Sequence, residues 1–118
     1  MLDRRKTYKV TMHDHERNGL TDGYEYAIRA EIRKEDGHTV LWYYNFERGH
    51  SPRGKVVKDL PNGIIFKATE LNWTFTLTEL TMEEFEAEIR PRLQPEVSAM
   101  LNDLDDVYTW CRQLAGIN

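Results

Sequence analysis

The sequence predicts an α+β protein: a five- to six-stranded, mostly antiparallel meander sheet followed by two C-terminal helices. Apolar and polar residues alternate repeatedly through residues 1–80, as expected for half-buried strands. An Asp-Gly turn separates the two longest alternating stretches. From Thr81 the apolar period changes from about two to about 3.6 residues. Strands grouped before helices are typical of the α+β class.

Length and composition predict a single domain over residues 1–118, with a sheet layer at 1–80 and a helical layer at 81–118. The net charge of −4 argues against binding of nucleic acid or anionic membranes by bulk attraction. No apolar run approaches the ~18 residues of a membrane span. With a single cysteine, Cys111, the chain cannot form an internal disulfide. These features predict a cytoplasmic protein that does not enter the membrane.

The first predicted strand covers residues 6–13, where Tyr8, Val10 and Met12 alternate with polar residues. A polar connection with two turn dipeptides follows, at residues 15–23. It leads into a long hairpin at residues 24–46, around which the rest of the sheet is expected to be arranged.

The hairpin turn permits two registers. A two-residue loop at Asp36-Gly37 pairs Glu31 with Trp42, which places charges beside aromatic residues. A three-residue loop that includes Glu35 pairs Ala30 with Trp42 and keeps the apolar residues together. Because a slip of one residue moves every side chain to the other face, burial favours the three-residue loop. This register predicts an inward set comprising Tyr26, Ile28, Ile32, Val40, Trp42, Tyr44 and Phe46.

The second half of the sheet begins after a loop at residues 47–54, which contains two glycines and a proline. A short strand is expected at 55–58, and the turn at 61–63 introduces two more strands at 64–69 and 73–78.

Two helices complete the chain. Thr81 and Glu84 have the spacing of a capping box, so a helix should begin there and end near Arg90, before Pro91. A longer helix at about 95–115 carries an apolar stripe and should pack on one face of the sheet.

Four basic or polar residues lie in the loop at 47–55 and form a candidate binding site for an anion or an acidic partner: Arg48, His50, Arg53 and Lys55. The loop has the Gly and Lys spacing of a phosphate-binding loop. Val56 stands where the hydroxyl that binds magnesium is needed, and no helix is expected to follow.

A second candidate binding surface lies on the outward face of the hairpin. In the favoured register Tyr43 shares this face with Arg29 and Arg33. An exposed tyrosine flanked by arginines can stack on a base or contact a partner protein.

No catalytic residue, metal site or cofactor is predicted. His13 and His15 lie two residues apart, but zinc needs further protein ligands. The acidic residues around Asp103 are interpreted as the solvated face of the second helix.

Three functions stay open, and catalysis is the less favoured expectation. The first is a non-catalytic protein-interaction or regulatory module with a protein partner. The second is a small-ligand binder or enzyme with a pocket between a curved sheet and the C-terminal helix. The third is a single-stranded nucleic-acid binder that uses the outer sheet face and the loop at 47–55, which the net charge disfavours. A homo-oligomer is compatible with all three.

Overall fold

The computed structural model describes residues 1–3, 5–16, 23–46 and 48–92. The protein consists mostly of antiparallel strands, and a short helical segment follows them. This arrangement confirms the broad α+β class. The strands form two sheets, however, where a single sheet was predicted. The strands are β1 (Tyr8–Asp14), β2 (Gly23–Ala27), β3 (Arg29–Glu35), β4 (His38–Tyr44), β5 (Gly49–His50), β6 (Gly54–Leu60), β7 (Gly63–Ala68) and β8 (Trp73–Glu79).

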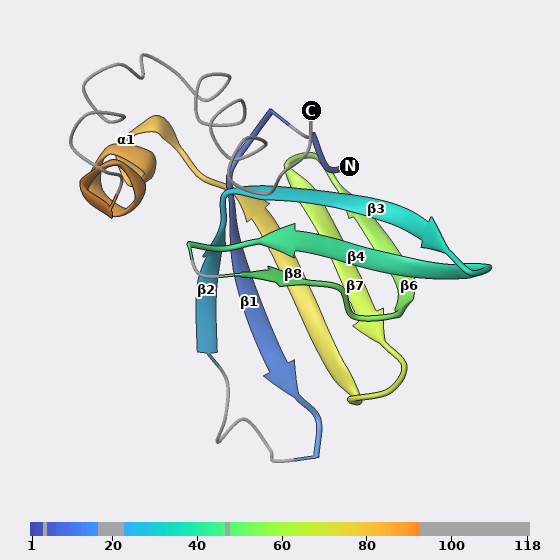
Figure 1. Ribbon diagram of the computed structural model, residues 1–118. Coiled ribbons are helices and arrows are strands. Elements are labelled where there is room, and N and C mark those ends of the chain that lie inside the picture. Colours follow the sequence, from blue (N-terminus) through green and yellow to red (C-terminus); the bar gives the residue numbers. More distant parts are fainter. Residues whose placement is uncertain (4, 17–22, 47, 93–118) are drawn as a thin grey trace.

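The larger sheet has the strand order β2-β1-β8-β7-β6, and the smaller has the order β3-β4-β5. Strands β6, β7 and β8 form the predicted meander, and β8 then pairs with β1, the first strand of the chain. Figure 1 shows β3 and β4 crossing the face of the larger sheet at a steep angle. The chain changes sheets at Ile28, which separates β2 from β3. A bend of this kind forms a corner between crossed sheets.

The register predicted for the hairpin is wrong. Glu35 pairs with His38 and Glu31 pairs with Trp42, so the loop has two residues. Asp36 and Gly37 both have positive φ, of 51° and 78°, as a type I′ turn requires. This turn matches the twist of the strands without a bulge. Local turn geometry therefore decides the register.

The two-residue turn also reverses the predicted orientations of Leu41, Trp42 and Tyr43 in β4, whereas Val40 is buried as predicted. Leu41 and Tyr43 are buried with Ala30 in the core between the sheets, and Trp42 lies on the outer face. Two guanidinium groups lie over the Trp42 ring, that of Arg33 at 4.2 Å and that of Arg29 at 5.0 Å. Cation–π contacts accommodate Trp42 beside charged residues, which the predicted register had treated as unfavourable.

The main core fills the space between the two sheets. Its largest fully buried members are Tyr8 and Phe66, which lie among smaller side chains from both sheets. A second cluster lies under the helical segment and includes Tyr26, Ile28 and Phe85. Tyr26 and Ile28 are therefore buried as predicted, but against the helical segment and not between the sheets.

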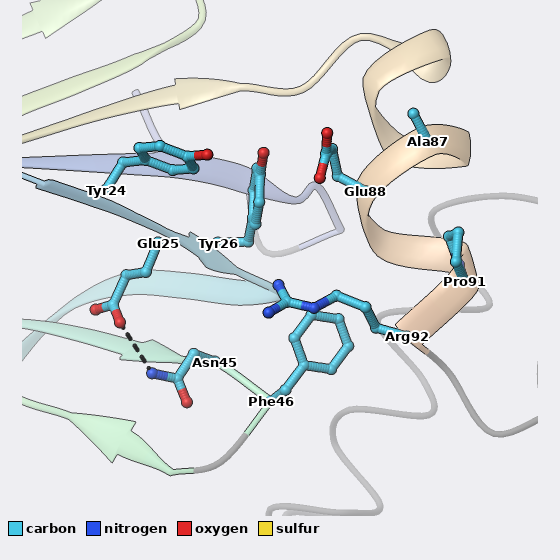
Figure 2. Close-up of a pocket in the computed structure, with 9 residues that line it drawn as sticks. All are labelled: Tyr24, Glu25, Tyr26, Asn45, Phe46, Ala87, Glu88, Pro91 and Arg92. Carbon is cyan, nitrogen blue, oxygen red and sulfur yellow. Dashed lines mark hydrogen bonds between the residues drawn. The ribbon is translucent and has the colours of Figure 1, made fainter.

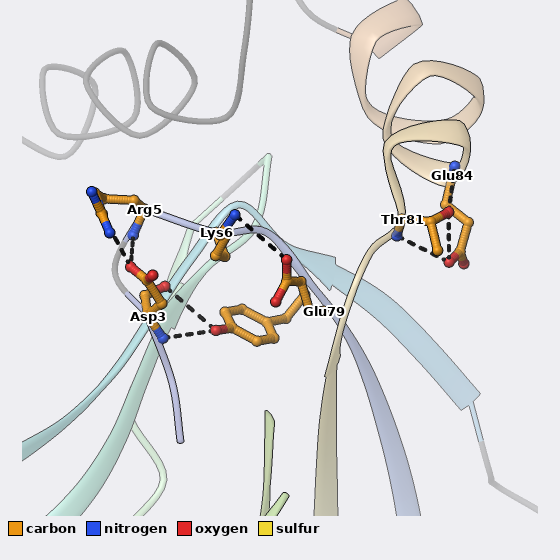
Figure 3. A network of polar contacts seen from close by, with 7 residues as sticks. Asp3, Arg5, Lys6, Glu79, Thr81 and Glu84 are labelled. Atoms are coloured by element: carbon orange, nitrogen blue, oxygen red, sulfur yellow. Dashed lines mark hydrogen bonds and ion pairs between the residues drawn. The ribbon is translucent and has the colours of Figure 1, made fainter. Parts of the chain in front are cut away.

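The helical segment begins at the predicted capping box. The backbone N–H of Glu84 donates to Thr81 Oγ1 at 3.1 Å, and the Glu84 carboxylate accepts from the Thr81 N–H at 3.3 Å (Figure 3). One α-helical turn, α1 (Met82–Glu84), is followed by the π-helical η1 (Phe85–Ile89) and the 3₁₀ turn η2 (Arg90–Arg92). The helical path thus includes Pro91, beyond the predicted end at Arg90. The predicted longer helix at 95–115 lies outside the described residues.

No helix among the described residues is long and apolar enough to cross a membrane.

Candidate functional site

A cavity of about 390 Å³ opens between the two sheets, near the start of β8. We call it the intersheet pocket. Its apolar wall consists of Met12 from β1, Leu71 from the β7–β8 connection, and Trp73 and Phe75 from β8. Its polar side includes Glu25 from β2, Tyr43 from β4 and His50 from β5. Apolar walls with a few convergent polar groups are typical of small-molecule sites.

The polar side of the pocket is a connected hydrogen-bond network. The Tyr43 hydroxyl donates to Glu25 Oε1 at 2.5 Å, and Asn45 Nδ2 donates to Glu25 Oε2 at 3.1 Å. Asn45 Nδ2 also lies 3.0 Å from His50 Nε2. Glu25 points inward because it shares a face of β2 with the fully buried Ala27. The network joins the edge of the larger sheet to the end of the smaller one.

The Asn45 amide is held in one orientation. Its Oδ1 accepts from the backbone N–H of Arg48 at 2.9 Å, so its Nδ2 must face Glu25 and His50. An amide nitrogen only donates, and His50 Nε2 must therefore accept. The same His50 nitrogen lies 4.0 Å from Glu25 Oε1, so Glu25, Asn45 and His50 meet at one point.

Tyr43 is a fixed donor in this network. Burial raises the pKa of the Tyr43 hydroxyl, and the hydrogen bond to Glu25 and the negative charge of Glu25 raise it further. The hydroxyl is therefore un-ionised at neutral pH and directed at the carboxylate. These are the properties of a positioning group and not of a general base.

Aromatic rings line the pocket from one sheet to the other. The Tyr43 and His50 rings stack with centroids 4.8 Å apart and an interplanar angle of 22°. Phe75 lies 6.4 Å from Tyr43 and 6.1 Å from Trp73, in tilted arrangements. Four aromatic side chains therefore contribute to the lining of one pocket.

A second cavity, of about 570 Å³, lies on the other side of Glu25, between the sheet and the helical segment (Figure 2). Tyr24 and Tyr26 of β2 line it in an edge-to-face pair with centroids 5.8 Å apart. On the opposite side Arg92 lies 4.9 Å from the centre of the Phe46 ring. Figure 2 also shows the hydrogen bond between Glu25 and Asn45, which borders this cavity.

The structure brings three of the predicted site residues together at the intersheet pocket: Tyr43, Arg48 and His50. Arg48 is exposed, whereas Tyr43 retains only 2% of its accessible surface. Arg53 and Lys55 are also exposed but do not line this pocket. Arg53 lies in the connection between β5 and β6, whereas Lys55 lies in β6 itself, so the predicted loop at 47–54 contains a short strand that was not predicted. Strands lie on both sides of this connection, as predicted, and no helix begins there to hold a phosphate.

Arg29 and Arg33 lie on the other face of the smaller sheet from Tyr43. The prediction that Tyr43 shares a face with them is wrong because the turn has two residues and not three. Both arginines bind Glu31: Arg29 Nη2 lies 3.2 Å from Glu31 Oε2, and Arg33 Nε donates to Glu31 Oε1. Arg29 is 3% exposed, so it belongs to a buried ion cluster.

Glu31 gives this ion cluster a pH dependence. Burial by itself raises the pKa of Glu31, but the hydrogen bonds and charges of Arg33 and Arg29 outweigh it and hold the pKa below its ordinary value. The cluster therefore stabilises the fold fully above the unfolded pKa, about 4.3, and this stabilisation is lost as the pH falls through the folded pKa. We expect Glu31→Gln to lower the free energy of unfolding by about 2 kcal/mol at pH 7.

Urea denaturation of the Glu31→Gln variant between pH 7 and pH 3 measures this effect. The difference from the unsubstituted protein should shrink below about pH 4. Glu35→Gln removes the same charge from the exposed hairpin end and should differ little from the unsubstituted protein at any pH. A constant deficit of Glu31→Gln across this range would contradict the ion-cluster assignment.

His13 and His15 contact each other edge to face, with ring centroids 4.6 Å apart, and His15 Nε2 lies 2.6 Å from Thr74 Oγ1. In the part of the chain that the structure describes, no three His, Cys, Asp or Glu side chains are grouped closely enough to hold a metal ion. The predicted acidic group around Asp103, and Cys111, lie outside that part.

Sequence analysis missed Glu25 and Asn45, which connect the network. The prediction that Tyr26 faces inward leaves Glu25, its neighbour in the strand, on the opposite and outer face. The useful signal was Ala27, which shares a face of β2 with Glu25, whereas Tyr26 on the opposite face packs under the helical segment.

Comparison of the chain with protein-family models, with curated proteins and with solved structures found no match.

Proposed function

We propose that this protein binds a small organic ligand in the intersheet pocket. The observation that carries the proposal is the network of Tyr43, Glu25, Asn45 and His50 at the side of a cavity with aromatic walls. Burying a carboxylate costs free energy. The Glu25 carboxylate faces inward and accepts a hydrogen bond on each oxygen, which fixes its orientation. A fixed polar group facing an apolar cavity is suited to orienting a bound molecule.

The second cavity supports the same class of function. This cavity, beside Tyr24 and Phe46, lies between the sheet and the short helical segment that ends at Arg92. The pocket predicted beside the longer helix at 95–115 falls outside the described residues and stays a prediction. The protein-interaction and nucleic-acid functions stay predictions. Tyr43 no longer supports stacking on the outer face, since its ring is buried between the sheets.

A pocket-blocking variant tests the proposal. Leu71 lines the intersheet pocket and is 51% exposed, so Leu71→Trp should fill the mouth of the pocket without disturbing the core. Val57 of β6 is exposed to a similar extent, 56%, and does not line the pocket, so Val57→Trp is a matched control.

Both variants and the unsubstituted protein would be screened against one fragment library by ligand-observed NMR. We expect fragments that bind the unsubstituted protein and Val57→Trp alike and bind Leu71→Trp at least about tenfold more weakly, equivalent to about 1.4 kcal/mol. If no fragment distinguishes Leu71→Trp from Val57→Trp, the intersheet pocket is not a ligand site.

A further inference from the structure

We infer that the ligand of the intersheet pocket is a small planar aromatic cation whose protonated amidine, guanidine or amine group binds Glu25. This inference rests on the proposed function and specifies the chemistry of its ligand. It follows from which hydrogen-bonding sites in the pocket are already used, and from the charge and shape of the surrounding side chains.

In this network the donors of Tyr43 and Asn45 are already directed at acceptors, whereas the Glu25 carboxylate can accept more hydrogen bonds. The Tyr43 hydroxyl is directed at Glu25 Oε1, and the two N–H groups of Asn45 are directed at Glu25 and His50. An ionised carboxylate only accepts and has about four lone-pair sites, two on each oxygen. Tyr43 and Asn45 each use one site on a different oxygen of Glu25. Both oxygens therefore keep capacity to accept, and a ligand with two N–H groups can use it in a bidentate contact.

Charge favours a cationic donor over a neutral one. The Glu25 side chain is 27% exposed, so its negative charge is only partly screened by water. Hydrogen bonds between ionised partners are about twice as strong as those between neutral groups. The positive charge of Arg48 repels a cationic ligand, but this side chain is exposed and solvent screens its charge. The more buried Glu25 therefore has the larger effect.

The walls of the pocket select for a flat, apolar body. Phe75 is 3% exposed and Trp73 partly exposed, and both line the same cavity as Tyr43. Aromatic rings attract cations as well as other rings. A planar aromatic body with a cationic end therefore complements both sides of the pocket.

The test uses three probes of nearly equal shape: benzamidine, benzamide and benzoate, which are cationic, neutral and anionic. Affinities are measured by NMR titration of the full chain. We expect benzamidine to bind at least about tenfold more tightly than benzamide, and benzoate to bind most weakly. Glu25→Gln should remove the preference for benzamidine, and Glu35→Gln, which removes an exposed charge away from the pocket, should retain it.

Tyr43→Phe provides a second variant that keeps the ring and every carboxylate. It releases one oxygen site of Glu25, so benzamidine should bind this variant at least as tightly as the unsubstituted protein. A tenfold loss in Tyr43→Phe would overturn the inference, because the hydroxyl itself would then be the ligand contact.

The ligand class and the proposed function fail in different ways. If benzamide binds as tightly as benzamidine, or benzoate binds more tightly, the ligand is not a cation although the pocket is a binding site. If none of the three probes binds and the fragment screen finds no ligand blocked by Leu71→Trp, both the ligand class and the proposed function are wrong.

Discussion

Replacing Gly63 with alanine is expected to lower the free energy of unfolding by about 3 kcal/mol or more. A Cβ atom at this position would lie 1.7 Å from the backbone carbonyl oxygen of Leu77 on β8. Backbone atoms cannot rotate aside as a side chain can, so β7 and β8 would have to separate where Gly63 pairs with Thr78. Urea denaturation monitored by far-UV circular dichroism measures the loss.

Gly23→Ala is the matched control for this substitution. Gly23 begins β2, and an added Cβ there would have no heavy atom within 4 Å. We expect a change of less than about 0.5 kcal/mol. Equal stabilities of the two variants would show that β7 and β8 do not approach as closely as described.

Leu41→Ala is expected to cost between about 2 and 5 kcal/mol, the range for removing a buried leucine side chain. Leu41 has no accessible surface and packs between the sheets, whereas Trp42 beside it lies outside. The same denaturation experiment measures the effect, and it tests the hairpin register directly.

Ile32→Ala is the control because Ile32 pairs with Leu41 across the hairpin and is 37% exposed. We expect it to cost less than about 1 kcal/mol. The three-residue loop would have placed Ile32 inward and Leu41 outward. A larger loss in Ile32→Ala than in Leu41→Ala would therefore contradict the two-residue turn.

Sequence patterns predicted those elements whose causes are local. The alternation of Tyr8, Val10 and Met12 defined β1, and Thr81 with Glu84 defined the start of the helical segment. The Asp36-Gly37 turn was located correctly, but its register was misjudged because hydrophobic alternation was given more weight than turn geometry. That error could have been avoided, since Asp-Gly supplies both positive φ angles of a two-residue loop.

The division into two sheets has no equally local cause. Nothing around Ile28 marks it as a corner, because the residues on both sides of it continue the same alternation. The corner exists because Tyr26 and Ile28 pack under the helical segment while Ala27 and Ala30 pack between the sheets. Such a switch depends on contacts between residues far apart in the chain.

Only part of the candidate site was predicted, for the same reason. Tyr43, Arg48 and His50 were singled out as aromatic or basic residues, but Tyr43 was placed on the wrong face. Glu25 is 18 residues from Tyr43 and joins it only when the two sheets meet. A pocket formed by segments so far apart cannot be identified from a motif.

The pairing of β1 with β8 has a consequence for synthesis on the ribosome. Met12 of β1 lies opposite Phe75 of β8, so the central pair of the larger sheet joins segments more than sixty residues apart. A nascent chain that has emerged only through β7 still lacks the strand that lies between β1 and β7. Until then β1 has an unpaired edge and an apolar face, which are features that chaperones recognise and that promote aggregation. The larger sheet can therefore be completed only after residues 73–79 leave the exit tunnel.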